Sequence, residues 1–156
     1  MKSKASCNPF SKCEIAEKSG THPIIVLKDR KGGPSMYRLK NNARHYVASN
    51  NVEDCLVNSD SSQCDFLVID CGHRTATFVE LKGSDLIRAV KQIQSALIQL
   101  RHQIPNDMKI HGRIILTRVN THDLRNNAFL RLQKQISHLG GVLKKSSNGF
   151  LEETNA

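Results

Sequence analysis

One stretch of the chain carries a clear helical pattern of hydrophobic residues. Ser84 is the expected N-cap, and Asp85 in the first turn places its negative charge at the positive end of the helix dipole. Pro105 is expected to end the helix. Between them, apolar side chains recur at spacings of four and three residues and so share one face: Leu86, Val90, Ile93, Leu97, Leu100 and Ile104. The pattern predicts a long helix that packs on a sheet.

Short apolar runs on both sides of this helix predict strands. Residues 66–69 and 75–79 have the composition of strands, and the turn-forming residues 70–74 between them favour a hairpin. Residues 113–119 are mostly apolar, as expected for a central strand. Strand, helix and strand then form a crossover connection, which is right-handed in nearly all sheets.

Weaker patterns complete the predicted architecture. Before the central hairpin we expect a short helix over 9–18, a hairpin of 23–27 with 36–39 around Gly32-Gly33-Pro34, and strands at 45–47 and 52–57 separated by the turn-prone Ser49-Asn50-Asn51. After the central strand we expect a second helix over 123–139 with Leu124, Ala128, Leu132 and Ile136 four apart, a stop at Gly140-Gly141, and a closing hairpin of 142–145 with 150–151. These elements predict one α/β domain over 1–156 with a central mixed β-sheet flanked by helices.

Candidate chemistry lies at the junction between the central hairpin and the long helix. An acidic residue stands two positions before a lysine three times in the chain, but Asp29-Arg30-Lys31 and Asp107-Met108-Lys109 adjoin turn residues. Only Glu80-Leu81-Lys82 ends an apolar strand, where the backbone is stiff enough to place side chains accurately. This context, and not the tripeptide itself, selects Glu80 and Lys82.

The expected register of the hairpin brings a second carboxylate to the same place. A turn centred near Gly72-His73 puts Asp65 across from Glu80 and Lys82. Side chains alternate along a strand, so Glu80 and Lys82 lie on one face, and a slip of one residue would send both to the other face. Two carboxylates bind a hard divalent cation through oxygen, and a lysine beside them steadies a water and the charge that develops on a phosphate.

Asp65, a gap of 14 residues, Glu80-x-Lys82 and a following helix resemble the PD-(D/E)xK nuclease superfamily, which includes many restriction enzymes and Holliday-junction resolvases. The resemblance covers about residues 45–120 and implies a restriction-endonuclease-like core. It also implies that Asp65 and Glu80 bind Mg²⁺ or Mn²⁺ and that Lys82 is the catalytic base or electrostatic stabiliser. Cys64 stands where the superfamily motif has proline.

Two further groups are candidates for this site. Glu53 and Asp54 precede Asp65 on an expected neighbouring strand, and one of them could reach the cation as an extra ligand. Gln92 enters through the resemblance, because some members of the superfamily use a glutamine from the helix. The simpler interpretation of Gln92 is a solvated helix residue.

Charge favours a polyanionic partner. The net charge of +9 is uneven, since residues 88–145 carry 11 Lys and Arg against two acidic residues. Such a basic half suits nucleic acid, whose phosphates attract cations. The chain has five Phe, two Tyr and no Trp, which argues against base stacking on a single strand and favours double-stranded or branched DNA. Arg125, Arg131 and Lys134, on the polar face of the second helix, are the candidate phosphate contacts.

Cysteine and histidine usage adds no second site at this stage. The five cysteines, at 7, 13, 55, 64 and 71, lack a paired C-x-x-C and are interpreted as free thiols without zinc. His73 lies in the hairpin turn, remote from Glu80, and is not expected to take part in catalysis. Without a membrane-length apolar segment or a signal peptide, the chain is expected to be cytoplasmic and not membrane-bound.

The resulting hypothesis is an endonuclease that depends on Mg²⁺ or Mn²⁺ and hydrolyses phosphodiester bonds, in DNA. Symmetrical cuts on two strands need two sites, which favours a homodimer. The alternative is a catalytically inactive nucleic-acid-binding module on the same fold. A third interpretation is a protein-interaction domain whose acidic cluster is structural.

Overall fold

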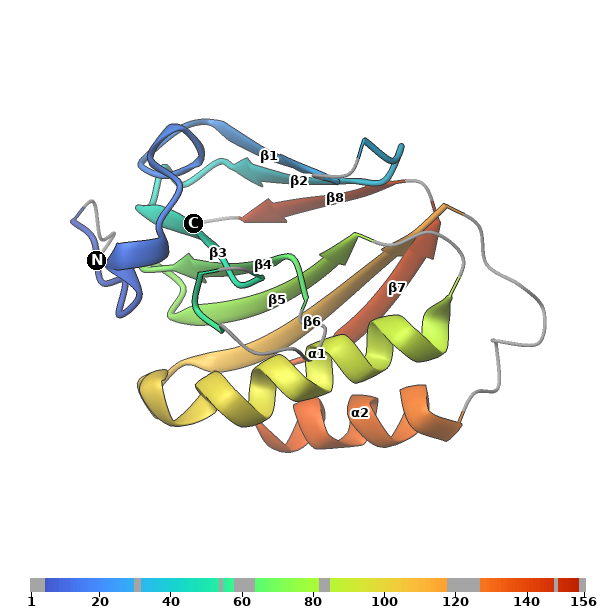
Figure 1. The fold of residues 1–156 in the computed structure, drawn as a ribbon. Coiled ribbons are helices and arrows are strands. Elements are labelled where there is room, and N and C mark those ends of the chain that lie inside the picture. Colours follow the sequence, from blue (N-terminus) through green and yellow to red (C-terminus); the bar gives the residue numbers. More distant parts are fainter. Residues whose placement is uncertain are drawn as a thin grey trace.

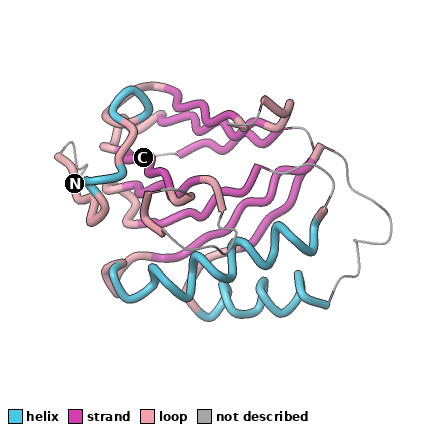
Figure 2. Tube along the Cα trace, viewed as in Figure 1, coloured by secondary structure: helices cyan, strands magenta, loops and turns pink. Residues whose placement is uncertain are grey.

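Two β-sheets lie one above the other, and two α-helices cover the far side of the larger sheet (Figure 1). The computed structural model describes residues 5–29, 32–53, 55–57, 64–81, 85–117, 127–147 and 149–154. Both sheets are mixed, with five and three strands, so the expected α/β class is confirmed. The helices do not flank the larger sheet on both faces, because the smaller sheet covers the other one (Figure 2).

The five-stranded sheet contains the predicted central hairpin and crossover. Its strands, in spatial order, are β3 (Val47–Asn51), β4 (Phe66–Asp70), β5 (Thr75–Leu81), β6 (Lys109–Leu116) and β7 (Leu143–Ser147). β3, β4 and β5 are antiparallel neighbours, whereas β6 is parallel to β5 and β7 is parallel to β6. The helix between β5 and β6 therefore connects two parallel strands, as predicted. β6 begins at Lys109, four residues before the predicted start.

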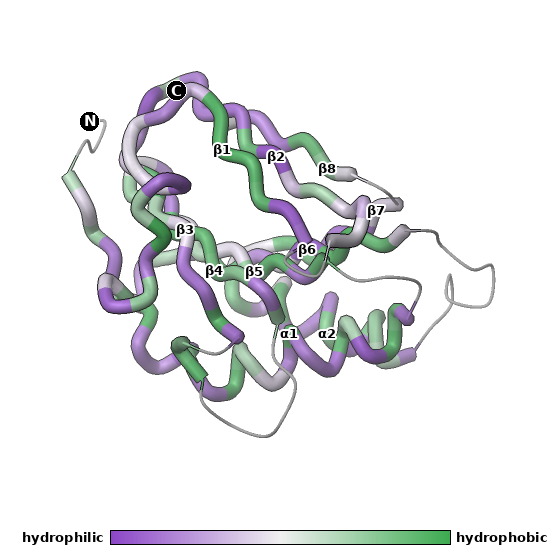
Figure 3. The backbone as a smooth tube through the Cα atoms, turned by 45° about the horizontal axis from the view of Figure 1, so that its top comes forward, coloured by the Kyte–Doolittle hydropathy of each residue, from purple (hydrophilic) through white to green (hydrophobic). Residues whose placement is uncertain are grey.

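Both helices have the expected amphipathic character. α1 (Leu86–Leu100) continues into a 3-10 turn (Arg101–Gln103), and α2 spans Asn127–His138. Figure 3 shows hydrophobic and hydrophilic residues alternating along both helices. All six apolar residues predicted between 86 and 104 are buried. The N-cap is Asp85, not Ser84 as predicted: the Asp85 backbone is extended and its carboxylate accepts a hydrogen bond from the Arg88 N–H at 2.9 Å.

The three-stranded sheet joins two distant parts of the chain. β1 (Ile24–Lys28) and β2 (Met36–Asn41) form the predicted hairpin, and β8 (Gly149–Thr154) lies parallel to β2. The predicted closing hairpin is therefore wrong, because β7 and β8 belong to different sheets. Between them the chain crosses from one layer to the other, and the Ser146 hydroxyl donates to the Gly149 carbonyl at 2.7 Å.

Two further predictions made from local patterns are wrong. Ser49-Asn50-Asn51 does not interrupt a strand but lies in β3, where Ser49 donates to the Lys18 carbonyl at 2.8 Å and Asn50 donates to the Leu67 carbonyl at 3.0 Å. The segment 9–18 forms two separate 3-10 turns, Ser11–Cys13 and Ala16–Lys18, in place of one helix.

Hydrophobic residues fill both sides of the larger sheet, and alternation decides which side each strand residue faces. Leu67 and Ile69 of β4 pack toward the helices, whereas Phe66 and Val68 pack toward the smaller sheet. In β5, Ala76 and Phe78 face the helices, and Val79 and Leu81 face the smaller sheet. Within the described residues, neither α1 nor α2 has the length and hydropathy of a membrane-spanning helix.

Two disulfides hold the N-terminal segment on the larger sheet. Cys7 is bonded to Cys71 and Cys13 to Cys55, with Cα–Cα distances of 5.6 and 5.8 Å, while Cys64 is a buried free thiol. The prediction of five free thiols is therefore wrong, because the bonded partners are too far apart in sequence to give a local signal. Disulfides are typical of oxidising compartments. The two disulfides therefore give no support to the cytoplasmic location expected from the sequence.

Candidate active site

The structure brings together the two carboxylates predicted from the hairpin. Phe66 of β4 lies opposite Val79 of β5, so Asp65, just before β4, stands next to Glu80. The Asp65 carboxylate accepts a hydrogen bond from the Leu81 N–H at 2.8 Å. Asp65 is 7% exposed and Glu80 is fully buried. The predicted register that places Asp65 across from Glu80 is thus confirmed.

Strand alternation also shows which face of the sheet carries this pair. Asp65 has the parity of Leu67 and Ile69, and Glu80 has the parity of Ala76 and Phe78. All four of these apolar residues face the helices. Both carboxylates therefore lie on the helix side of the larger sheet, at the end of β5 from which the chain continues toward α1.

The buried thiol of Cys64 lies in the electric field of nearby acidic groups. Burial raises the pKa of this thiol well above its usual value, and the negative charges of Glu80, Asp65 and Glu53, in that order, raise it further. Three carboxylates therefore act on one buried sulfur atom. Glu53, one of the two predicted extra ligands, has the weakest effect of the three on this thiol, whereas Asp54 lies outside the described residues.

Gln92 is buried, contrary to the simpler interpretation of a solvated helix residue. It lies on α1, about six residues after the helix begins, and only 2% of its surface is exposed. Its neighbours in the helix, Val90 and Ile93, belong to the core between the helices and the sheet. Gln92 therefore lies on the face of α1 that packs toward the side of the sheet carrying Asp65 and Glu80.

The basic residues of the hypothesis are placed only in part. Lys82, the predicted catalytic lysine, lies outside the described residues, directly after the last residue of β5. Arg125 also lies outside them. Arg131 and Lys134 are exposed on α2, where they lie one turn apart on the same side of the helix. Both side chains are thus available to a partner in solution.

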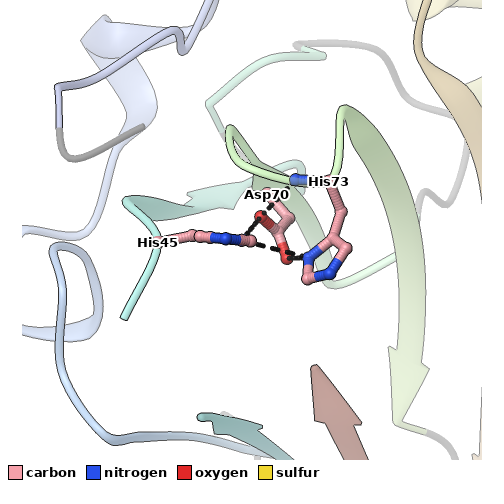
Figure 4. Close-up of side chains that lie close together, drawn as sticks. All are labelled: His45, Asp70 and His73. Atoms are coloured by element: carbon pink, nitrogen blue, oxygen red, sulfur yellow. Dashed lines mark hydrogen bonds and ion pairs between the residues drawn. The ribbon is translucent and has the colours of Figure 1, made fainter. Parts of the chain in front are cut away.

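A second group of polar side chains meets at the other end of the central hairpin (Figure 4). The Nδ1 atoms of His45 and His73 are 3.1 Å apart. Asp70 lies between them, with one carboxylate oxygen 3.2 Å from His45 Nδ1 and the other 3.0 Å from His73 Nδ1. Asp70 and His45 are buried, whereas His73 is partly exposed. This cluster has the parity of Phe66 and Val68, so it faces the smaller sheet.

Comparisons with protein-family models, with curated proteins and with solved structures find no match for this chain.

The donor atoms of the acidic group and of the histidine-containing group indicate which ions each can bind. Asp65, Glu80 and Glu53 offer carboxylate oxygens and Gln92 an amide oxygen, which suits a hard cation such as Mg²⁺ or Mn²⁺. The histidine-containing group suits a softer ion.

Sequence reasoning found the acidic group and missed the histidine cluster. His73 does lie remote from Glu80, as predicted, but its partner His45 is 28 residues away in sequence. The spacing Asp70-x-x-His73 within a turn was a local signal, because it allows both side chains to point the same way. Nothing in the sequence near His45 indicated that it would complete the group.

Proposed function

We propose that this protein is a metal-dependent nuclease that hydrolyses phosphodiester bonds in DNA. The observation that carries the proposal is the meeting of Asp65 and Glu80 at the end of β5, immediately before Lys82. A restriction-endonuclease-like core forms part of the proposal. It is supported by three antiparallel strands followed by α1 and a strand parallel to β5.

In this proposal Asp65 and Glu80 hold Mg²⁺ or Mn²⁺, with Glu53 as a further acidic neighbour. A divalent cation there neutralises charge on the scissile phosphate and lowers the pKa of the attacking water. The Leu81 N–H fixes the Asp65 carboxylate by its hydrogen bond, so this side chain is oriented before a substrate arrives. Adjacent carboxylates repel one another, and a bound cation makes their closeness favourable.

Lys82 and Gln92 complete the proposed chemistry. Lys82 has a single positive charge that stabilises the negative charge on the phosphate oxygens in the transition state. Gln92 is buried on α1, the helix that packs on the side of the sheet carrying the carboxylates. There its amide can position the water or a phosphate oxygen.

The proposed substrate follows from charge. The chain has a net charge of +9, and Arg131 and Lys134 present two of its cations on the exposed face of α2. Cations in this position contact backbone phosphates without reading sequence. Double-stranded or branched DNA supplies those phosphates at regular spacing.

The deciding experiment is cleavage of plasmid, linear and branched DNA with Mg²⁺, with Mn²⁺ and with chelator. We expect cleavage only with metal, and a loss of about 100-fold or more in Asp65→Asn and in Lys82→Ala. Asp107→Asn, in an exposed turn, and Lys109→Ala, at the exposed first residue of β6, are matched controls, because they alter the same tripeptide pattern away from the site and should cleave normally. Circular dichroism checks that each variant is folded.

Two results would remove the proposal. Unchanged cleavage by Asp65→Asn or Lys82→Ala would show that the reaction occurs elsewhere. Salt-sensitive DNA binding without any product, in the presence of either metal, would instead favour a nucleic-acid-binding module that does not catalyse.

A further inference from the structure

We propose that His45, Asp70 and His73 form a binding site for Zn²⁺ or a similar transition-metal ion. Within the part of the chain that the structure describes, the potential ligand atoms of these three residues lie within 4.8 Å of one another. The site stands apart from the acidic group. Asp70 is five residues from Asp65 along β4, which corresponds to about 17 Å, and it faces the opposite side of the sheet.

The spacing of the three side chains fits a small ion with short bonds. Zn²⁺ binds histidine nitrogen and carboxylate oxygen at about 2.0–2.1 Å, so neighbouring ligand atoms around a tetrahedral ion are roughly 3.3 Å apart. The two Nδ1 atoms are 3.1 Å apart, and each lies 3.0–3.2 Å from a different oxygen of Asp70. These separations are close to those of neighbouring ligands around such an ion, and the carboxylate could offer either of its oxygens to it.

The chemistry of the three atoms also favours an ion. Two Nδ1 atoms that face each other at 3.1 Å cannot both carry a proton on the facing side. Both also face an oxygen of the same carboxylate, which has lone pairs and no proton when ionised. When both facing nitrogens are unprotonated, each directs a lone pair toward the carboxylate, and the three side chains together can ligate a cation. Two imidazoles with one carboxylate are a donor set that zinc takes in catalytic sites and that Mg²⁺ does not prefer.

The surrounding backbone holds Asp70 in position before any ion binds. One oxygen of Asp70 accepts hydrogen bonds from the Gly72 and His73 N–H groups at 3.0 and 3.1 Å. The neighbouring Cys71 is tied to Cys7 by a disulfide. Hydrogen bonds of this kind orient the ligands of metal sites.

His45 is held by a different set of contacts. The buried Asn41 side chain accepts from the His45 N–H at 3.1 Å and donates to the His45 carbonyl at 2.8 Å. A Cβ atom at Gly72 would lie 2.0 Å from the His45 ring, so the ring can approach only because residue 72 is glycine. Among the described residues, the non-glycine residues with positive φ are Arg44 and Arg74, directly before His45 and after His73. Such backbone strain is common at functional sites.

Three protein ligands leave one position of a tetrahedral ion open. Asp70 and His73 line a pocket of about 200 Å³ between the two sheets, together with His111 and Arg113. This volume is below the range of about 300–1,000 Å³ typical of pockets for drug-sized ligands, but it admits several water molecules. The fourth ligand is therefore water or a small anion that enters from this pocket.

The test measures Zn²⁺ binding by the full chain after treatment with chelator, using isothermal titration calorimetry with zinc chloride. We expect one tight site per chain, and a loss of about 100-fold or more in affinity for His73→Ala, because one of three ligands is removed. Gly72→Ala retains all three ligand side chains but displaces the His45 ring, and it should weaken binding similarly. His102→Ala, at an exposed histidine outside the cluster, is the matched control and should bind normally.

A measurement on the unaltered chain keeps the proposal testable if a variant fails to fold. In NMR spectra of ¹⁵N-labelled protein, zinc should shift the Nδ1 resonances of His45 and His73 and leave that of His102 unchanged. Co²⁺ provides a second probe, since a four-coordinate centre absorbs visible light. The proposal is overturned if zinc leaves both Nδ1 resonances unchanged, or if His73→Ala and Gly72→Ala bind it as tightly as the parent.

Discussion

Removal of one disulfide should cause a loss of stability whose size follows from the structure. Replacing Cys13 and Cys55 together by alanine opens this bridge without leaving an unpaired thiol. The bridge joins residues 42 positions apart. In the chain-entropy model, a cross-link of this span stabilises the folded state by about 4 kcal/mol at 25 °C, because the unfolded chain loses freedom. In a chain of this size the loss should lower Tm by roughly 8–16 °C.

The second bridge gives an internal comparison. Cys7 and Cys71 are 64 positions apart, for which the same model gives slightly more than about 4 kcal/mol. The loop closed by Cys13–Cys55 lies within the larger loop closed by Cys7–Cys71. In the unfolded chain, each bridge therefore restricts some of the same residues as the other bridge. A variant lacking all four cysteines should therefore lose more stability than the sum of the two double variants, because each double variant keeps one bridge that still restricts its unfolded chain.

Urea-induced unfolding followed by circular dichroism measures these differences, with and without reductant. Reductant should bring the parent close to the variant that lacks both bridges and should barely change that variant. Thiol titration in urea should detect one thiol, that of Cys64, before reduction and five after it. Five thiols before reduction would refute the reasoning. So would a Cys13/Cys55 double variant whose free energy of unfolding equals that of the parent within about 0.5 kcal/mol.

Three further predictions concern single side chains. Asp85→Ala should lower the free energy of unfolding by about 1 kcal/mol, because it removes the N-cap of α1. The control Asp107→Ala breaks only an exposed ion pair and should lower the free energy of unfolding by less. Equal urea midpoints for the two variants would contradict this prediction. Burial and the positive charge of Arg113 lower the pKa of His111, so the unfolded chain takes up this proton first and stability should fall as the pH drops below about 6.5. In His111→Gln that decline should be shallower in urea titrations at several pH values, and an unaltered decline would exclude His111 as its source. Glu152→Ala should lower the free energy of unfolding by about 3 kcal/mol, because it leaves the buried Arg113 guanidinium without its carboxylate partner at 2.9 Å. Glu152→Gln should lower it by less. Thermal or urea unfolding measures both losses, and the opposite order would rule out an electrostatic cause.

Local patterns predicted the parts of the fold that depend on neighbours in sequence. The six apolar residues of the long helix repeat within single turns, so their shared burial followed from helical geometry alone. The β4–β5 register likewise followed from a short turn, which is why Asp65 and Glu80 were placed together from the sequence. Both predictions needed no knowledge of the rest of the chain.

Long-range contacts determined the parts that were missed. β7 and β8 adjoin in sequence, yet β8 pairs with β2, where Met36 lies opposite Gly149. No local property of residues 149–154 distinguishes that partner from β7. The disulfides and the histidine cluster fail for the same reason, since His45 and Asp70 are 25 positions apart. Asn50 was predicted to lie in a turn because it is polar, but inside the sheet its side chain donates a hydrogen bond to the distant Leu67 carbonyl.

The parallel pairing of β8 with β2 bears on the order in which the chain folds during synthesis. β2 emerges from the ribosome early, but β8, the last of the described strands, follows more than a hundred residues later. Until then one edge of β2 lacks its partner, and the apolar layer beneath lacks Phe150. An unpaired strand edge beside exposed apolar surface invites pairing with other chains. We therefore expect nascent chains that stop before residue 149 to require protection by chaperones. Once β8 has paired with β2, the chain should no longer need that protection.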